Sequence, residues 1–133
     1  MEQQVKAVSK LRKMELEVIP TGYILVEGGK QTATLRVTNT KPLEDEQDII
    51  DTAKASELLG MKLIYLEAGS GAKWGVSAKI IKAVKDDIKI PLIVGGGIRN
   101  SVQLEDAYSA GANLVVIGTA FEENEHFFDD LEV

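Results

Sequence analysis

Three short stretches of this chain are apolar at nearly every position. They are KLIYL at residues 62–66, PLIV at residues 91–94 and LVVI at residues 114–117. Strands that are apolar on both faces are typical of a parallel sheet covered by helices. A fourth strand is predicted over residues 17–26, where a Pro–Thr–Gly run interrupts it. The pattern therefore predicts four strands in a parallel sheet.

The segments around these strands have the spacing of helices. In residues 4–14, the apolar residues Val5, Val8 and Leu11 recur on one helical face. Further helices are predicted over residues 48–59, 77–84, 101–110 and 125–131. Ser77 suits a helix N-cap, and Gly111 suits a helix end.

The order of these elements is one helix followed by four strand–helix units. This alternation predicts an α/β fold, and no linker divides residues 1–133 into two domains. Residues 32–38 form either a short strand or an ordered loop. An acidic run precedes the second helix, at Glu44, Asp45, Glu46 and Asp48. Its simplest interpretation is the preference for acids at a helix start, with metal binding as the alternative.

Composition narrows the classes of function. The chain is 44% hydrophobic and 27% charged, as a folded domain is, and no apolar run approaches the length of a membrane span. It has no cysteine and one histidine, so disulfides, thiolate metal centres and multi-histidine metal sites are excluded. The net charge of -6 argues against nucleic acid as a partner. The start of the chain is polar and charged, without a signal-peptide pattern, so a cytoplasmic location is expected.

Glycines follow three of the predicted strands. EAGSGAK comes after KLIYL, GGGIR after PLIV, and GT after LVVI. Ligands of parallel α/β sheets bind at the carboxyl ends of the strands. Glycine lets backbone N–H groups approach a phosphate closely, and the following helix adds the positive end of its dipole. The pattern favours a phosphate site, and tight turns without a ligand are the alternative.

Glu67 is the candidate catalytic residue, because it stands directly after an apolar strand among these loops. Its carboxylate suits accepting hydrogen bonds from substrate hydroxyl groups, and a solvated loop acid is the alternative. Tyr65 either points away from Glu67 or lines the strand end, and core packing is its simplest role.

Five segments of the chain resemble the geranylgeranylglyceryl phosphate synthase family and its heptaprenylglyceryl phosphate synthase relatives. They are IPTGYILVEGG, NTKP, LGMKLIYLEAGSGAK, IPLIVGGGIR and VVIGTAFEE, which span about Leu16 to Glu122. The resemblance implies a TIM (β/α)8 barrel that joins sn-glycerol 1-phosphate to a polyprenyl diphosphate as an ether. It also implies that one set of residues holds glycerol 1-phosphate: Tyr65, Leu66, Glu67, Ala68, Gly69, Ser70, Gly71, Gly96, Gly97, Gly118 and Thr119.

The same resemblance implies Mg2+ at the leaving diphosphate. A full barrel has roughly 250 residues, so we expect this chain to carry strands 5 to 8, about half a barrel. The magnesium ligands are then expected outside this chain, and no metal ligand is assigned within it. Tyr23, Thr40 and Lys41 are weak candidates for contact with the prenyl diphosphate.

Two alternatives stay open beside the prenyltransferase. One is a catalytically incomplete half-barrel that binds phosphate and pairs with itself, or with a complementary half, through exposed sheet edges. The other is a different phosphate-binding barrel enzyme that acts on sugar phosphates.

Overall fold

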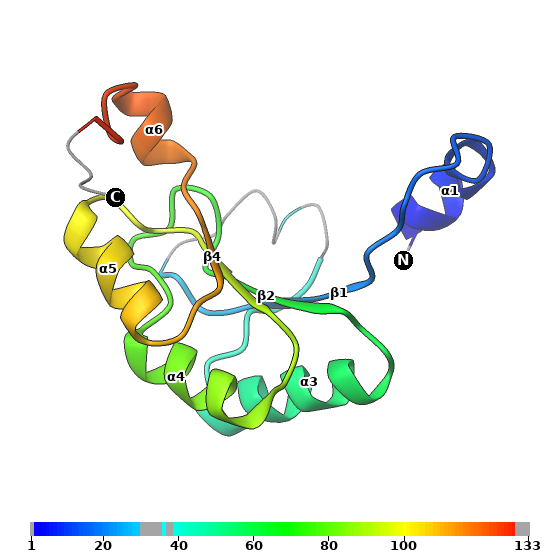
Figure 1. Cartoon of the computed structure of the whole chain (residues 1–133), viewed down its shortest axis with the longest axis horizontal. Coiled ribbons are helices and arrows are strands. Elements are labelled where there is room, and N and C mark those ends of the chain that lie inside the picture. Colours follow the sequence, from blue (N-terminus) through cyan, green and yellow to red (C-terminus); the bar gives the residue numbers. More distant parts are fainter. Residues whose placement is uncertain (1, 30–35, 37–38, 130–133) are drawn as a thin grey trace.

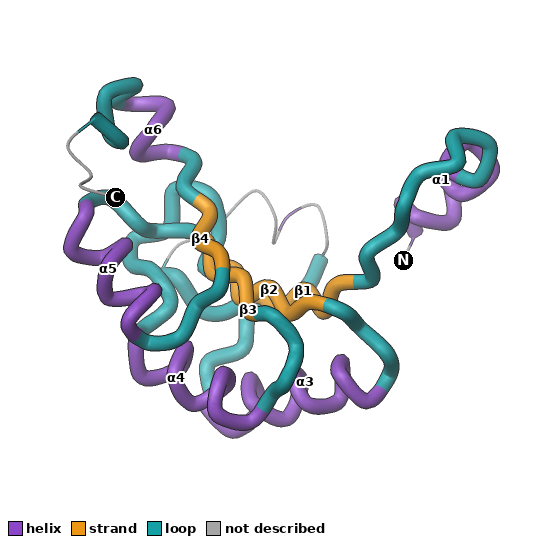
Figure 2. Tube along the Cα trace, in the orientation of Figure 1, coloured by secondary structure: helices purple, strands orange, loops and turns teal. Residues whose placement is uncertain are grey.

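The computed structural model describes residues 2–29, 36 and 39–129, and it is built on one parallel sheet (Figures 1 and 2). The strands are β1 Thr21–Leu25, β2 Leu63–Glu67, β3 Leu92–Gly95 and β4 Leu114–Val116. They lie side by side in the order in which they occur in the sequence, and every pairing is parallel. The predicted four-strand parallel sheet is therefore confirmed.

The helices that follow β1, β2 and β3 cover one face of the sheet (Figure 2). The helices are α1 Glu2–Leu11, α3 Glu46–Leu58, α4 Ala78–Asp87, α5 Ser101–Ser109 and α6 Thr119–Glu123. Of these, α3, α4 and α5 pack against the sheet or against one another. Helix α1 lies away from the sheet, at the opposite end of the molecule from α5 and α6 (Figure 1). No helix in the described ranges has both the length and the apolar character needed to cross a membrane.

The core lies between the sheet and these three helices. Alternate strand residues such as Ile64, Leu66 and Val94 are almost fully buried there, against Ile49 of α3 and Ile81 of α4. Successive side chains of a strand point to opposite faces, so the neighbours of these residues point to the other face of the sheet.

Capping side chains set the starts of the covering helices. The carboxylate of Asp45 accepts from the Asp48 N–H at 3.1 Å, so α3 begins earlier than predicted. The predicted N-cap Ser77 is confirmed, because its hydroxyl accepts from the Ile80 N–H. The acidic run before α3 thus caps and opens a helix, as its simplest interpretation holds.

The predicted helix over residues 125–131 is wrong for its described part. Helix α6 instead starts at Thr119, directly after β4, and residues 125–129 form turns. Asn124 ends α6 in an extended conformation, and its side chain accepts from the His126 N–H at 3.1 Å. A local bond of this kind competes with helix continuation. The predicted element over residues 32–38 lies outside the described residues, apart from position 36.

The second face of the sheet has no helix over it among the residues that the structure describes. Tyr23 and Leu114 on this face are 49% and 48% exposed, and Val116 is also exposed. Apolar residues of the amino-terminal arm are exposed as well, including Val8 and Leu11 on α1. An apolar sheet face and an apolar helix stripe thus both lie open to solvent in the described structure.

Replacing Leu66 tests the core. Leu66 is fully buried, so Leu66→Ala should lower the free energy of unfolding by about 2–5 kcal/mol, measured by urea denaturation. Leu58→Ala is the matched control, because Leu58 is 89% exposed and should change stability by less than about 0.5 kcal/mol. Equal losses for the two variants would contradict the placement of the core.

Candidate functional site

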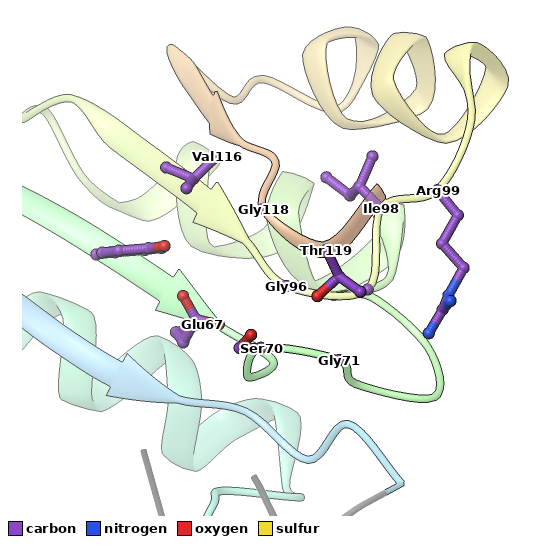
Figure 3. Close-up of a pocket in the computed structure, with 11 residues that line it drawn as sticks. Glu67, Ser70, Gly71, Gly96, Ile98, Arg99, Val116, Gly118 and Thr119 are labelled. Atoms are coloured by element: carbon purple, nitrogen blue, oxygen red, sulfur yellow. The ribbon is translucent and has the colours of Figure 1, made fainter. Parts of the chain in front are cut away.

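The loops after β2, β3 and β4 surround one pocket with a volume of about 110 Å³ (Figure 3). It is lined by Tyr65, Glu67, Ser70, Gly71, Gly96, Gly97, Ile98, Arg99, Val116, Gly118 and Thr119. All three loops lie at the carboxyl ends of neighbouring parallel strands. The strand pairing explains this, because Glu67, Gly95 and Val116 are in register across the sheet.

Eight of the eleven candidate residues line this pocket. The other three are Leu66, Ala68 and Gly69. Leu66 lies in the hydrophobic core on the opposite face of β2, and Ala68 is buried. Gly69 contributes its backbone, because its N–H donates to Glu67 Oε1 at 2.7 Å.

The sequence prediction missed three lining residues, Ile98, Arg99 and Val116. Ile98 and Arg99 complete the GGGIR run, so their position beside the glycines was the available signal. Val116 was missed because it belongs to an apolar strand, and only the strand's orientation shows that its side chain faces the pocket.

Glu67 is a buried carboxylate that ends β2. It is only 6% exposed, and Oε1 accepts from the Gly69 N–H. Burial of a carboxylate is costly unless hydrogen bonds compensate for lost hydration. The position of Glu67 at the carboxyl end of the strand turns its side chain into the pocket (Figure 3). Remaining lone pairs of this carboxylate can accept from a ligand's hydroxyl groups.

Tyr65 lies on the same face of β2 as Glu67, two residues earlier, so of the two predicted alternatives the structure favours the one in which it lines the strand end. Burial raises the pKa of the Tyr65 phenol far above its ordinary value, and a hydrogen bond to Glu67 raises this pKa further. Tyr65 is therefore protonated at neutral pH and donates to the carboxylate. The Tyr23 ring packs edge-on against it, with centroids 4.9 Å apart.

Gly96 and Gly97 have backbone conformations that side chains rarely adopt, with φ of +83° and +74°. A β-carbon at Gly96 would stand 2.8 Å from Glu67 Oε1 and 2.6 Å from the Gly69 nitrogen. One at Gly97 would stand 2.5 Å from the backbone of Trp74 and Gly75. Both glycines are needed for close approach between the loops as well as for their φ angles.

The third loop leads from β4 directly into α6. The N–H groups of Phe121 and Glu122 both donate to the Gly118 carbonyl, at 2.9 and 3.0 Å. This bonding leaves the N–H groups of the first helical residues outside the helix ladder, at its positive end. Thr119 and Ser70 lie on loops that face each other across the pocket (Figure 3).

Arg99 connects two of the loops from the rim. Its guanidinium Nη2 donates to the Ala72 carbonyl at 3.0 Å, and its backbone N–H donates to Gln103 Oε1 at 2.7 Å. Figure 3 shows the side chain extending from the loop after β3 towards the loop that contains Gly71. Arg99 thus adds positive charge near the pocket and holds the β2 and β3 loops together.

The arrangement suits a small anion that carries hydroxyl groups. Backbone donors and small residues surround one side, and a hydrogen-bonded carboxylate stands on the other. Glu67 is the one carboxylate that lines this pocket within the described ranges, where no group of three or more acidic, histidine or cysteine side chains gathers. Tyr23 and Lys41 are two of the three candidates for contact with the prenyl diphosphate. Tyr23 contacts Tyr65, which lines the pocket, whereas Lys41 is exposed in the segment after β1.

Fold and pocket together define a parallel α/β protein with its site at the carboxyl ends of the strands. More particularly, the chain belongs to the PcrB family, whose model matches residues 1–132. The expected family resemblance is therefore confirmed.

Named relatives agree with this family. The chain is 60% identical over 126 residues to the geranylgeranylglyceryl phosphate synthase of Zunongwangia profunda, covering 93% of this chain and 54% of that protein. It is 55% identical over 130 residues to the Flavobacterium johnsoniae enzyme of the same name, covering 96% of this chain and 54% of that protein. The chain thus spans about half the length of the curated relatives it matches.

A solved structure agrees as well. It is a crystal structure of (S)-3-O-geranylgeranylglyceryl phosphate synthase from Thermoplasma acidophilum in complex with its substrate sn-glycerol-1-phosphate. The TM-score is 0.86 at 34% identity, over 95% of this chain and 51% of that one.

The phenol of Tyr65 makes a prediction about alkaline stability. Because its pKa is raised on folding, the unfolded chain loses this proton first, near pH 10, and then binds fewer protons than the folded chain. Stability is therefore fully present below about pH 10 and is lost as pH rises above it. Tyr65→Phe should reduce this alkaline loss, measured by urea denaturation between about pH 8 and pH 11.

The control for alkaline unfolding is Tyr108→Phe, since Tyr108 is an exposed tyrosine on α5. The Tyr108→Phe variant should lose as much stability at alkaline pH as the parent chain does. A Tyr65→Phe profile that superimposes on both the parent and the control would show that the Tyr65 proton does not contribute.

Proposed function

We propose that this chain carries the glycerol-phosphate site of a prenyltransferase that forms an ether between sn-glycerol 1-phosphate and a geranylgeranyl-like polyprenyl diphosphate. The observation that carries the proposal is the buried Glu67 carboxylate facing three small-residue loops in one pocket. The names of the relatives, and sn-glycerol-1-phosphate in the Thermoplasma acidophilum structure, support it.

In this proposal, the phosphate lies against the backbone of the loops at Gly96, Gly97, Gly118 and Thr119. Hydrogen bonds from backbone N–H groups to an anion are stronger than those between neutral groups, which favours a phosphate in this position. The charged phosphate would thereby fix the orientation of the glycerol, and positioning of this kind lowers the barrier to reaction.

Glu67 would accept hydrogen bonds from the glycerol hydroxyl groups and orient the attacking oxygen. In the reaction, this oxygen forms a bond to the allylic carbon, the bond from that carbon to the diphosphate oxygen breaks, diphosphate leaves, and the hydroxyl proton passes to the Glu67 carboxylate. Tyr65 and the Gly69 N–H both donate to Glu67 and so hold this carboxylate in the orientation in which it meets the hydroxyl group. The expected Mg2+ and a cytoplasmic location stay predictions, and no step here depends on them.

The arrangement of strands supports a TIM-barrel origin for this site. Four consecutive parallel strands in sequence order, with helices on one face, match half of an eight-stranded barrel. In a complete barrel the opposite face would enclose packed side chains, which explains why Tyr23 and Leu114 there are large and uncharged.

Replacing Glu67 tests the glycerol contact. Glu67→Ala should weaken sn-glycerol 1-phosphate binding about ten-fold more than inorganic phosphate binding, because inorganic phosphate lacks the glycerol hydroxyl groups that would donate to the carboxylate. Isothermal titration calorimetry measures both affinities. The exposed Glu105→Ala on α5 is the control and should change neither. Equal losses for the two ligands would make Glu67 a structural residue, and no heat with the parent chain at millimolar ligand would contradict the phosphate site.

A second candidate function is a phosphate-binding half-barrel without catalysis that associates with itself or with a complementary half. The exposed apolar face of the sheet, at Tyr23, Leu114 and Val116, favours it. Labelled sn-glycerol 1-phosphate and a polyprenyl diphosphate separate the two functions, because only the transferase forms the ether product.

Association through the open face can be tested directly. Leu114→Lys should shift the chain towards monomer, because a charge would be buried in any pairing over this face. Light scattering across a concentration series measures the mass, and Leu59→Lys, on the exposed end of α3, is the control. A parent chain that stays monomeric at high concentration would remove the self-association proposal.

A further inference from the structure

Gly95 differs from the two glycines that follow it. It does not line the pocket, and its φ lies outside the left-handed region, so neither phosphate contact nor backbone conformation requires glycine there. It ends β3 in register with Glu67 of β2, and its carbonyl accepts from the Ala68 N–H at 2.9 Å. Backbone bonds of this kind are open to any residue, so another constraint must act on this position.

The space above Gly95 is filled by Tyr65. A β-carbon at Gly95 would stand 2.9 Å from Cε2 and 3.1 Å from Cζ of the Tyr65 ring, and closer still to the hydroxyl. Such contacts are tighter than real β-carbons show, so the ring would have to move. Tyr23 packs edge-on against the same ring, so displacement of Tyr65 would also break this contact.

The position of the Tyr65 ring matters because its hydroxyl is bonded to Glu67. Together with the Gly69 N–H at 2.7 Å, it gives the buried carboxylate two donors from the protein. An ionised carboxylate offers about four lone-pair sites. The two donors therefore determine which sites are left for a ligand and fix the carboxylate's rotation.

We propose that Gly95 is a positioning residue, which keeps the Tyr65 hydroxyl on Glu67 and so sets the preference of the pocket for phosphates that carry neighbouring hydroxyl groups. The ligand class rests on the proposed function, whereas the positioning of Tyr65 does not. Methyl phosphate has the same anionic group without hydroxyl donors, so the ratio of its affinity to that of sn-glycerol 1-phosphate measures the preference.

Gly95→Ala and Tyr65→Phe should each reduce this preference about ten-fold, as expected for loss of a hydrogen bond to a charged group. The double variant should lose no more than Tyr65→Phe alone, because both changes remove the same bond. Gly118→Ala is the matched control, since a β-carbon there would meet nothing within 4 Å. It should change both affinities by one factor and leave the ratio unchanged.

A second measurement is independent of ligand. In the chain labelled with carbon-13 at the tyrosine ζ position, nuclear magnetic resonance should show Tyr65 titrating above the ordinary tyrosine range, and Gly95→Ala and Glu67→Gln should both bring its pKa back towards that range. Circular dichroism establishes that each variant is folded. If Gly95→Ala is not folded, Tyr65→Phe and Glu67→Gln decide whether the bond between Tyr65 and Glu67 sets the preference, because neither adds an atom beside Gly95.

These results separate the two proposals. A preference that survives in Tyr65→Phe, or a Tyr65 titration that is unchanged in Glu67→Gln, would overturn the positioning role while leaving glycerol-phosphate binding intact. Failure of the parent chain to bind either ligand would overturn the proposed function, and the titration would still decide the role of Gly95.

Discussion

The site depends on the register of the parallel strands. Leu25, Glu67, Gly95 and Val116 are aligned across the sheet, and each is the last residue of its strand. Because the chain leaves each strand at the same level, the following loops meet at one edge. A shift of one residue in β3 would turn its side chains to the opposite face and separate Gly96 from Glu67.

Much of this arrangement could be predicted from the sequence. The apolar strands identified a parallel sheet, and the glycines after them identified the edge at which the pocket lies. These predictions succeed because they depend on local composition and on a topological rule that holds for parallel sheets. The role of Ser77 as an N-cap was predictable for the same reason, since capping is decided within one turn.

The errors involve orientation and competition between local bonds. Sequence spacing places Tyr65 and Glu67 on one face only if both belong to the strand. The predicted strand ended at residue 66, whereas β2 includes Glu67. The predicted terminal helix failed because Asn124 bonds to the His126 N–H instead of continuing α6. Leu66 belongs to the same motif, and the alternation within β2 buries its side chain in the core, so its predicted contact with the ligand is left to its backbone.

A pocket formed mainly by main chain has a particular response to mutation. A side-chain donor can be deleted by many substitutions, whereas a backbone N–H at Gly96 or Thr119 remains with every residue except proline. What substitution can change is the distance between loops, because a single added carbon at Gly96 or Gly97 meets backbone or carboxylate atoms at less than 3 Å. Substitution at Gly96 or Gly97 should therefore be limited by the volume of the new side chain, whatever its charge or polarity.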